Sequence, residues 1–508
     1  MNYEPYKIDD SYEVFITNYN NELVDISDIV EQFNLFFDLF NPVVKLELII
    51  QDGFGLLEDL PILGEETVTI SMKSINLEVN GRSFYEKPIV LVFRVYKITD
   101  KVQVANRANL YKLHCTSQEG HNNMRYAVWK SFNDVEGKKI IQEIYDDYLK
   151  PDPEEYSIFN KFDIEFDDIK FDNKEDKYSY IFNGDKPLLA ISRLIKRFRN
   201  FERGHKASNF IFYQGNDRWY LKTIDNLIDP EIKTLRDADP KSKIQDFYFL
   251  DPRIENEKGN SIFGKFIRPD QKILSFHVLR QLDNEENLDR GMFFNTTHML
   301  DPLIKRYKKE VFLYEEDRKD LVHLENIFSA KKASVYTAES QYKTDITATE
   351  CDEYMQRRTI FTQIGEEYET GFLAAVADND IQIKNPERIV DHYKLQYVSM
   401  LKLNNMSVEI SIPGNTDLEI GQLLNLNILA NNLGSTNVKK GDPLSLNRLY
   451  GNKTLGGFWL ITNIRHTFVL KDANFITYIQ CIRDVFHNND SVYNNPAALA
   501  IDSLAGTT

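Results

Sequence analysis

The chain has 508 residues, of which 42% are hydrophobic and 12% aromatic, so it can build more than one core and is not disordered as a whole. Its formal net charge of −17 argues against tight general binding to nucleic acid, which needs a basic surface. Cys115, Cys351 and Cys481 are scattered without CxxC spacing, so neither a disulfide framework nor a zinc site is expected.

The ends and the apolar runs indicate no targeting or membrane segment. The start, MNYEPYKIDDSYE, is acidic and polar, unlike a signal peptide. The longest apolar runs, such as VVKLELII and PIVLVF, are far shorter than the roughly 20 residues of a membrane span. We therefore expect no transmembrane segment and folding in a reducing cytoplasm.

The first 115 or so residues have the pattern of β-strands. Five runs are rich in β-branched and aromatic residues, and turn residues such as Asn41-Pro42 and Asn80-Gly81 separate them. This spacing predicts a barrel or a sandwich. The runs are YEVFITN (12–18), KLELIIQD (45–52), ETVTISMK (66–73), IVLVFRVYKI (89–98) and LYKLHCT (110–116).

Helical spacing follows after residue 119. One helix is predicted over GKKIIQEIYDDYL (137–149), and a second begins at Pro187, whose fixed φ suits a first turn. The second helix has an apolar stripe and a basic opposite face that includes Arg193 and Arg197. Such a face is either a solvated surface or a docking site for an acidic partner.

The rest of the chain is predicted unevenly. A hairpin turning at Gly215-Asn216-Asp217 is expected over 209–227, while residues 230–380 give no clear assignment. From Pro386 a helix is expected, followed by alternating strands on either side of Pro413-Gly414-Asn415. Strands at 458–470 and 474–484 then form a hairpin, and the tail from His487 is expected to be flexible or to order on a partner.

No catalytic or metal-binding motif is present. The nine histidines include no HxxxH or HExxH pair, and GxSxG, GxxxxGK[ST] and GxGxxG motifs at a helix start are absent. Gly53-Phe54-Gly55 is interpreted as a turn, and His466 as a core or interface histidine. The adjacent Glu65 and Glu66 would point to opposite faces of a strand. We expect no catalytic residue, no cofactor and no metal site, although a carboxylate pair of a hydrolase cannot be located from one sequence.

Four stretches together resemble the central hub protein of contractile-tailed phage baseplates, with distant kinship to the hub part of the VgrG proteins of type VI secretion. They occur in the order of that family and cover about 40% of the chain, while residues 233–384 match no part of it. The stretches are LELIIQDGFGLLEDLPILGEETVTISM (46–72), DKPLLAISRLIKR (185–197), FIFYQGNDRWYLKTIDNL (210–227), and PGNTDLEIGQLLNL together with GGFWLITNIRHTFVLKDANFITYIQCIRD (456–484), which ends in the family's Arg483-Asp484.

The resemblance implies an α+β fold with two similar antiparallel β-barrels, called tube domains. The first would be 1–118. The second would begin at 208–232 and finish at 385–487. Mixed α/β insertions at 119–207 and 233–384 would form an outer domain, and 488–508 would be a flexible tail.

The resemblance also implies a structural virion protein of the tail baseplate, assembled in the host cytoplasm and without enzymatic activity. Three copies would surround a channel for DNA ejection and join the sixfold tail tube, or a tube-initiator protein, to a separate trimeric spike. Baseplate wedge proteins and the tape measure protein are further expected partners. If the acidic charge lined the channel, it would repel exiting DNA.

Three alternatives stay open. The chain could be the hub of a phage-derived injection machine without a genome, a tail-associated cell-wall hydrolase with carboxylates in 233–384, or a receptor-binding tail protein. For the hub, strand alternation selects candidate ring-interface or lumen-facing residues on polar strand faces, which are Glu409, Ser411, Asn463 and Arg465.

Overall fold

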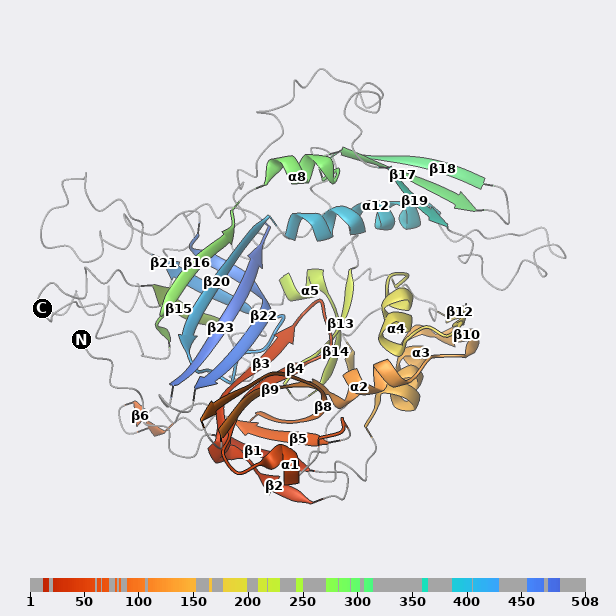
Figure 1. Cartoon of the computed structure of the whole chain (residues 1–508). Helices are drawn as coiled ribbons and strands as arrows, with labels where there is room; N and C mark the ends of the chain where they lie inside the picture. Colours follow the sequence, from red (N-terminus) through yellow and green to blue (C-terminus); the bar gives the residue numbers. More distant parts are fainter. Residues whose placement is uncertain are drawn as a thin grey trace, which may run out of the picture.

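The computed structural model places most predicted strands and helices of the chain (Figure 1). It describes residues 12–17, 22–59, 62–64, 66–72, 78–79, 82–83, 89–105, 108–151, 164–166, 177–198, 209–216, 218–228, 244–249, 271–281, 283–292, 294–301, 306–313, 359–363, 386–403, 405–428, 455–469 and 474–484. Antiparallel strands dominate these residues, with helices at the side and above.

The N-terminal half-sheet consists of six strands from the first 117 residues. These are β1 (Tyr12–Thr17), β3 (Val30–Asp38), β4 (Lys45–Asp52), β5 (Thr67–Met72), β8 (Ile89–Ala105) and β9 (Ala108–Ser117). A short β2 (Leu23–Asp25) pairs with β1. Smaller elements are η1 (Ser27–Ile29), α1 (Leu56–Asp59), β6 (Glu78–Val79) and β7 (Arg82–Ser83).

The C-terminal half-sheet also consists of six strands. These are β15 (Gln245–Phe249), β16 (Ser275–Arg280), β20 (Met406–Pro413), β21 (Leu423–Ile428), β22 (Gly457–Val469) and β23 (Asn474–Arg483). The helix α12 (Pro386–Leu403) leads into β20. β20 ends at Pro413, where the predicted turn Pro413-Gly414-Asn415 begins. Gly414 lies so close to Phe475 that an added Cβ would be 1.9 Å from the Phe475 ring.

The remaining elements lie beside and above the two half-sheets (Figure 1). The lateral group contains α2 (Gln118–Arg125), β10 (Ser131–Glu136), α3 (Gly137–Ile144), the π-helix η2 (Tyr145–Leu149), β11 (Ile164–Phe166), β12 (Lys177–Ile181), α4 (Pro187–Ile195), β13 (Phe210–Gln214), β14 (Trp219–Thr223) and α5 (Ile224–Ile228). The upper group contains α8 (Asn284–Asp289), β17 (Phe294–Asp301), β18 (Arg306–Leu313) and β19 (Thr359–Gln363).

The two half-sheets join in one 13-stranded sheet. Its main path is β16-β20-β23-β22-β3-β4-β9-β8-β5-β1-β2, and β15 and β21 branch from β22. Residues 457–460 of β22 pair with β21, whereas residues 463–469 pair with β3 of the N-terminal half-sheet. The path has two ends, and no closed barrel is found among the described strands.

The two half-sheets repeat the same strand order. The N-terminal order is β3-β4-β9-β8-β5-β1 and the C-terminal order is β16-β20-β23-β22-β21-β15. In both, the strands follow the chain order second, third, sixth, fifth, fourth, first. All neighbours are antiparallel except β15 and β21, which are parallel where β1 and β5 are antiparallel.

The correspondence extends to single residues of the two long hairpins. Val95 pairs with Cys115 in the β8–β9 hairpin, and Ile461 pairs with Cys481 in the β22–β23 hairpin. In each hairpin a bulge follows directly after this pair, which increases the local twist of the strand. Both cysteines are buried and free.

Most of the predicted strands and helices are confirmed, with shifts of a few residues, although β8 continues to Ala105. In the two half-sheets, strands β3, β15 and β16 were not predicted. The hairpin at 209–227 is confirmed as β13 and β14, but these strands form a separate sheet with β11. The division into domains at the stated boundaries stays a prediction. Asn80-Gly81, residues 471–473 and the tail from His487 lie outside the described residues.

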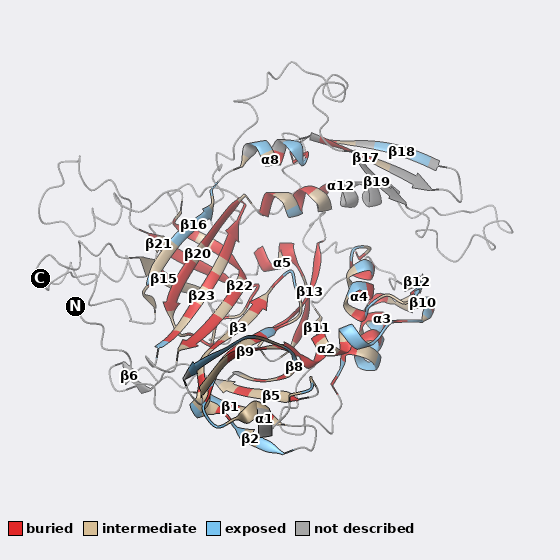
Figure 2. Ribbon diagram, viewed as in Figure 1, coloured by how far each residue is buried: buried red, intermediate tan, exposed pale blue. Residues whose placement is uncertain are grey.

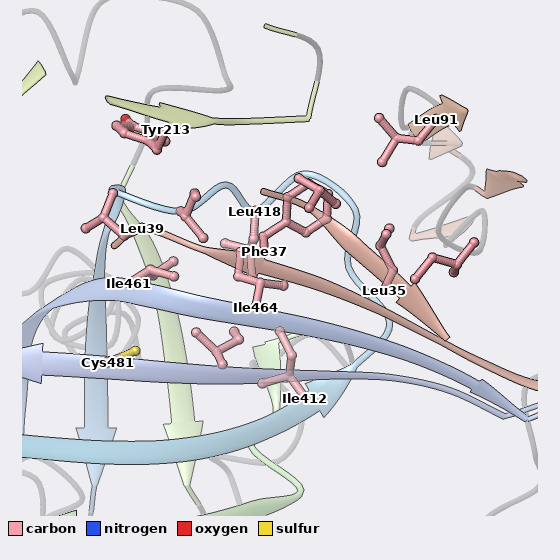
Figure 3. Close-up of a cluster of buried hydrophobic side chains, with 14 of the residues drawn as sticks. Leu35, Phe37, Leu39, Leu91, Tyr213, Ile412, Leu418, Ile461, Ile464 and Cys481 are labelled. Atoms are coloured by element: carbon pink, nitrogen blue, oxygen red, sulfur yellow. The ribbon is translucent and has the colours of Figure 1, made fainter. Parts of the chain in front are cut away.

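The main hydrophobic core lies on one face of the joined sheet. It contains the inward residues of both half-sheets, and strands β20, β22 and β23 are mainly buried in Figure 2. Figure 3 shows Phe37 of β3 beside Ile464 of β22, its partner in the ladder. A second core joins α3, α4 and the outer side of the β13–β14 hairpin. The two half-sheets therefore share one continuous core.

Candidate assembly surfaces

The four predicted site residues lie on the same face of the joined sheet. Gln480 of β23 pairs with Glu409 on one side and with Asn463 on the other. Tyr478, two residues away and hence on the same face, pairs with Ser411 and with Arg465. Alternation along two separate strands therefore selected one surface, although its role as an interface or a channel wall stays a prediction.

The local surroundings of these four residues differ. Ser411 is only 5% exposed, and its Oγ lies 2.6 Å from Ser275 Oγ of β16. Glu409, Asn463 and Arg465 are half-buried. The Arg465 guanidinium lies over the Tyr478 ring at 4.1 Å from its centroid, which is a cation–π contact. Ser411 therefore acts within the chain, and the other three can be reached from solvent.

This surface, which we name the polar face, continues into the N-terminal half-sheet. Residues of β3, β4 and β9 extend it by ladder pairing and alternation. Its charged members along β20, β22, β3, β4 and β9 are Glu409, Arg465, Asp38, Lys45, Glu47 and Lys112. Both signs are present in equal number on these strands, so this part of the polar face lacks the acidic excess on which the expected repulsion of DNA depends.

The joint between the half-sheets is the contact of β3 with the second part of β22. Thr467 Oγ1 donates to Asn34 Oδ1 at 2.9 Å on the polar face. On the opposite face the Phe33 and Phe468 rings stack with centroids 5.3 Å apart. The residues on the core face of this joint are almost fully buried. The joint therefore has the packing of a core and a complete ladder of backbone pairs.

His466 lies in this joint and is a core histidine, as predicted. It is fully buried, its Nδ1 lies 3.0 Å from Thr477 Oγ1, and its Nε2 has no hydrogen-bond partner. Burial lowers the pKa of His466 to about 3, because the apolar surroundings disfavour the charged ring. The ring is therefore neutral at physiological pH.

A buried ion pair closes the end of β23. Lys402 of α12 and Asp484 are both almost completely buried, and Lys402 Nζ lies 3.5 Å from Asp484 Oδ2. Burial lowers the pKa of Lys402, and the nearby carboxylates of Asp484 and Asp225 oppose this shift. Arg483 donates from Nη1 to Gly456 O at 2.8 Å. The Arg483-Asp484 pair therefore fixes the C-terminal strand to its neighbours.

Among the described residues, Glu66 has a local structural role. Its carboxylate accepts the backbone N–H groups of Leu63 and Gly64 at 2.8 Å each and shapes a turn directly before β5. Across the described ranges of the chain, no group of three His, Cys, Asp or Glu side chains is arranged to hold a metal ion. None of the helices in the described part is both long and apolar enough to cross a membrane.

Residue patterns did not predict three strands at the edges of the half-sheets, which are β3, β15 and β16. β3 has a clear signal, since Phe33, Leu35 and Phe37 alternate with polar residues. β16 has a weaker signal, because its six residues, SFHVLR, lie in the polar part of the chain that gave no assignment. Recognising β3 would have completed the N-terminal set of strands, but its pairing with β22 is a long-range contact that the pattern does not contain.

Comparisons with known proteins find similarity in structure only. No family model and no curated protein sequence matches the chain. The fold is similar to that of a tail protein from Neisseria meningitidis MC58, with 9% identity, 93% of this chain and 97% of that chain covered and a TM-score of 0.46. It is also similar to the 43 kDa tail protein of prophage MuSo2 from Shewanella oneidensis, with 10% identity, 93% and 99% coverage and a TM-score of 0.44.

A third neighbour is the Francisella PdpA–VgrG complex in its half-lidded form, with 10% identity and a TM-score of 0.39. The alignment covers 94% of this chain and 59% of that chain. These neighbours are thus two tail proteins, one of them from a prophage, and a VgrG complex, in keeping with the group that the sequence resembles. At these identities the similarity concerns the fold alone.

Proposed function

We propose that this chain is the structural central hub of a contractile-tail baseplate, and that three copies form a ring around a channel through which DNA is ejected. The observation that carries the proposal is the repeated strand order of the two half-sheets, which are joined edge to edge with one apolar and one polar face. Because each chain contains two similar half-sheets, three chains in a ring present six of them. A ring of three such chains adapts sixfold symmetry to threefold symmetry.

The polar face supplies the surface of the channel in this proposal. Glu409, Asn463 and Arg465 lie on it and can meet solvent or a neighbouring chain. The mixed charges of its strands fit a wall that neither binds nor strongly repels a passing polyanion. In the ring, the sixfold tail tube or a tube initiator lies above, and a separate trimeric spike lies below.

The elements outside the joined sheet are assigned to contacts with other baseplate proteins. The lateral group has a core of its own, built on α3, α4 and one side of the β13–β14 hairpin. The upper group has a small core between β18 and α12. Such independently packed surfaces can contact wedge proteins and the tape measure protein without distorting the ring. In this proposal the protein has no enzymatic activity.

The test is the mass and shape of the purified chain, alone and mixed with the candidate spike from a neighbouring gene. Light scattering should give the mass of three chains, and negative-stain images should show a ring with a central hole and a roughly sixfold outline. A single chain in both samples, with no ring, would overturn the proposal. A peptidoglycan zymogram should show no clearing; a cleared band that depends on this chain would favour a hydrolase.

A further inference from the structure

The joint inside the chain provides a template for a second joint. Because the half-sheets share strand order, the β22 strand of one corresponds to β8 of the other, and β3 corresponds to β16. Inside the chain, β22 pairs with β3 from Asn463↔Asp38 to Val469↔Gln32. The corresponding contact would pair β8 with β16, which lie in different half-sheets and do not meet within one chain.

Both of these corresponding edges are uncovered within the described residues. β8 pairs with β5 over residues 89–94 only. The part of β8 after Arg94 therefore has β9 on one side and no described strand on the other. β16 pairs with β20 and has no described strand on its far side. An open edge of this kind presents unpaired backbone N–H and C=O groups to another strand.

Both open edges carry apolar side chains that are exposed to solvent within the single chain. Val278 of β16 is 40% exposed, whereas Leu35, its counterpart in β3, is fully buried. The two correspond because each pairs with the residue opposite a hairpin cysteine, Val408 and Leu46 respectively. A position that is buried in the internal joint is thus exposed at the open edge.

The same relation holds on β8. Val102 is 57% exposed, whereas Thr467, its counterpart in β22, is 9% exposed. These two correspond because each pairs with the residue five places before a hairpin cysteine, Leu110 and Ile476 respectively. Val104 is also exposed, at 58%. Apolar side chains on an open strand edge favour a partner strand over water.

We propose that β8 of one copy pairs antiparallel with β16 of a second copy, with Val102 in the position that Thr467 has in the internal joint. This inference rests on the proposed ring and names the strands that close it. The internal pair of Thr467 and Asn34 has a counterpart in Val102 and His277, because Asn34 and His277 each pair with the equivalent glutamate, Glu47 and Glu409. Val102 of one copy therefore lies opposite His277 of the next.

A second copy of the chain fits these edges better than another partner does. Each chain has one β8 edge and one β16 edge, so the contact between copies is head-to-tail. Every such edge is covered only when the copies close into a ring. The internal joint already shows that strands of these two types pair in one continuous sheet. In the closed ring, internal joints and joints between copies alternate, and the polar face becomes continuous.

The test uses paired cysteines at the proposed contact. In a Cys351→Ser background, which leaves only the buried Cys115 and Cys481, Val102→Cys and His277→Cys are introduced together in the full chain. Mild oxidation of the assembled sample should link most chains to one another through these two positions, and a reductant should reverse the linkage. On a non-reducing gel the largest closed species gives the number of copies in the ring.

Two controls fix the register and the geometry. Asn34→Cys with Thr467→Cys, at the internal counterpart, should form its bridge within a single chain. Val104→Cys with His277→Cys, displaced by two residues, should link at least fivefold less than the pair at Val102. If rings form but only the internal pair bridges, the pairing of β8 with β16 is wrong while the hub stands. If no ring forms, both proposals fail.

A charge on the open edge provides an independent readout. Val278→Asp should lower the ring population at least tenfold at a concentration where the unmodified chain is assembled, because a carboxylate would be buried between strands. Ile181→Asp is the matched control, since Ile181 is a strand residue that is 69% exposed and lies away from both edges. Rings of unchanged stability in the Val278→Asp variant would overturn the proposal.

Discussion

The two half-sheets are built alike but end differently. Their long hairpins share the cysteine position and the bulge that follows it, yet β22 has β3 on its outer side whereas the second part of β8 has no described neighbour there. The pairing of β22 with β3 thus shows how the outer edge of the C-terminal half-sheet is covered within the chain. The comparison teaches that the repeated strand order sets the fold of each half, while the edge strands determine what each half can join.

A second difference lies at the ends of the hairpins. β9 continues directly into α2, and Ser117 caps that helix by accepting the Gly120 N–H. β23 ends at Arg483, and the buried pair of Lys402 and Asp484 follows. The N-terminal half-sheet is therefore closed by a helix cap and the C-terminal one by an ion pair. Four predictions probe these differences.

The largest effect is expected at the buried ion pair. Lys402→Met should lower the free energy of unfolding by about 3–5 kcal/mol, because it leaves the Asp484 carboxylate buried without its cation. Chemical denaturation of the purified chain measures this loss. Combining Lys402→Met with Asp484→Asn should restore most of the stability. A double variant as unstable as the single variant would show that the ion pair is not the cause.

The next effect compares corresponding positions of the internal and open edges. Leu35→Ala should cost about 2–5 kcal/mol, because Leu35 is fully buried in the internal joint. Val278→Ala, at the open edge, should cost less than about 1 kcal/mol in single chains, because Val278 is partly exposed. Denaturation in dilute solution, with the single-chain state checked by light scattering, compares the two. Equal losses would mean that β16 is already covered within the chain.

A pH-dependent effect of intermediate size is expected from His466. Its folded pKa of about 3 lies below the unfolded value of 6.5, so the unfolded state binds more protons between these limits. Its contribution is therefore intact above pH 6.5 and is lost progressively as the pH falls toward 3. Between pH 7 and pH 5 this loss is about 2 kcal/mol.

The measurement is denaturation of the unmodified chain and of His466→Gln at several pH values. The variant should lose less stability than the unmodified chain between pH 7 and pH 5, whatever its stability at pH 7. Parallel pH profiles for the two proteins would contradict the neutral, buried state of His466.

The smallest effect is expected on the polar face. Arg465→Gln removes the cation–π contact with Tyr478 and should cost about 0.5–1 kcal/mol, because the arginine is half-buried. Arg465→Lys keeps the charge and should retain part of the contact. Thermal unfolding of the two variants measures the difference. A loss of several kcal/mol in Arg465→Gln would place Arg465 in a core and not on an accessible face.

Sequence patterns predicted the strands with strong alternation and failed where the pattern was weak or the pairing was distant. KLELIIQD gave β4 at its observed boundaries, because its alternation and flanking turns are both local signals. The same reasoning placed Glu409 with Ser411, and Asn463 with Arg465, on the polar face of their own strands, and pairing of both strands with β23 brings the two pairs onto one face of the sheet. The reasoning could not give the burial of Ser411, which depends on Ser275 of the unpredicted β16. The joint of β3 with β22 depends on pairing across the length of the chain, which periodicity does not contain.

The pairing of β3 with β22 also sets an order of events during synthesis. Thr467 and Asn34 are 433 residues apart, so at about 5–20 residues per second the ribosome needs roughly 20–90 s after β3 to produce its partner. During that time β4 can pair with one edge of β3, while the edge that later pairs with β22 stays unpaired. A nascent chain on a neighbouring ribosome exposes the same unpaired edge of β3. Slow or interrupted translation between the two half-sheets is therefore expected to favour mispaired chains over soluble protein, even when no residue has been changed.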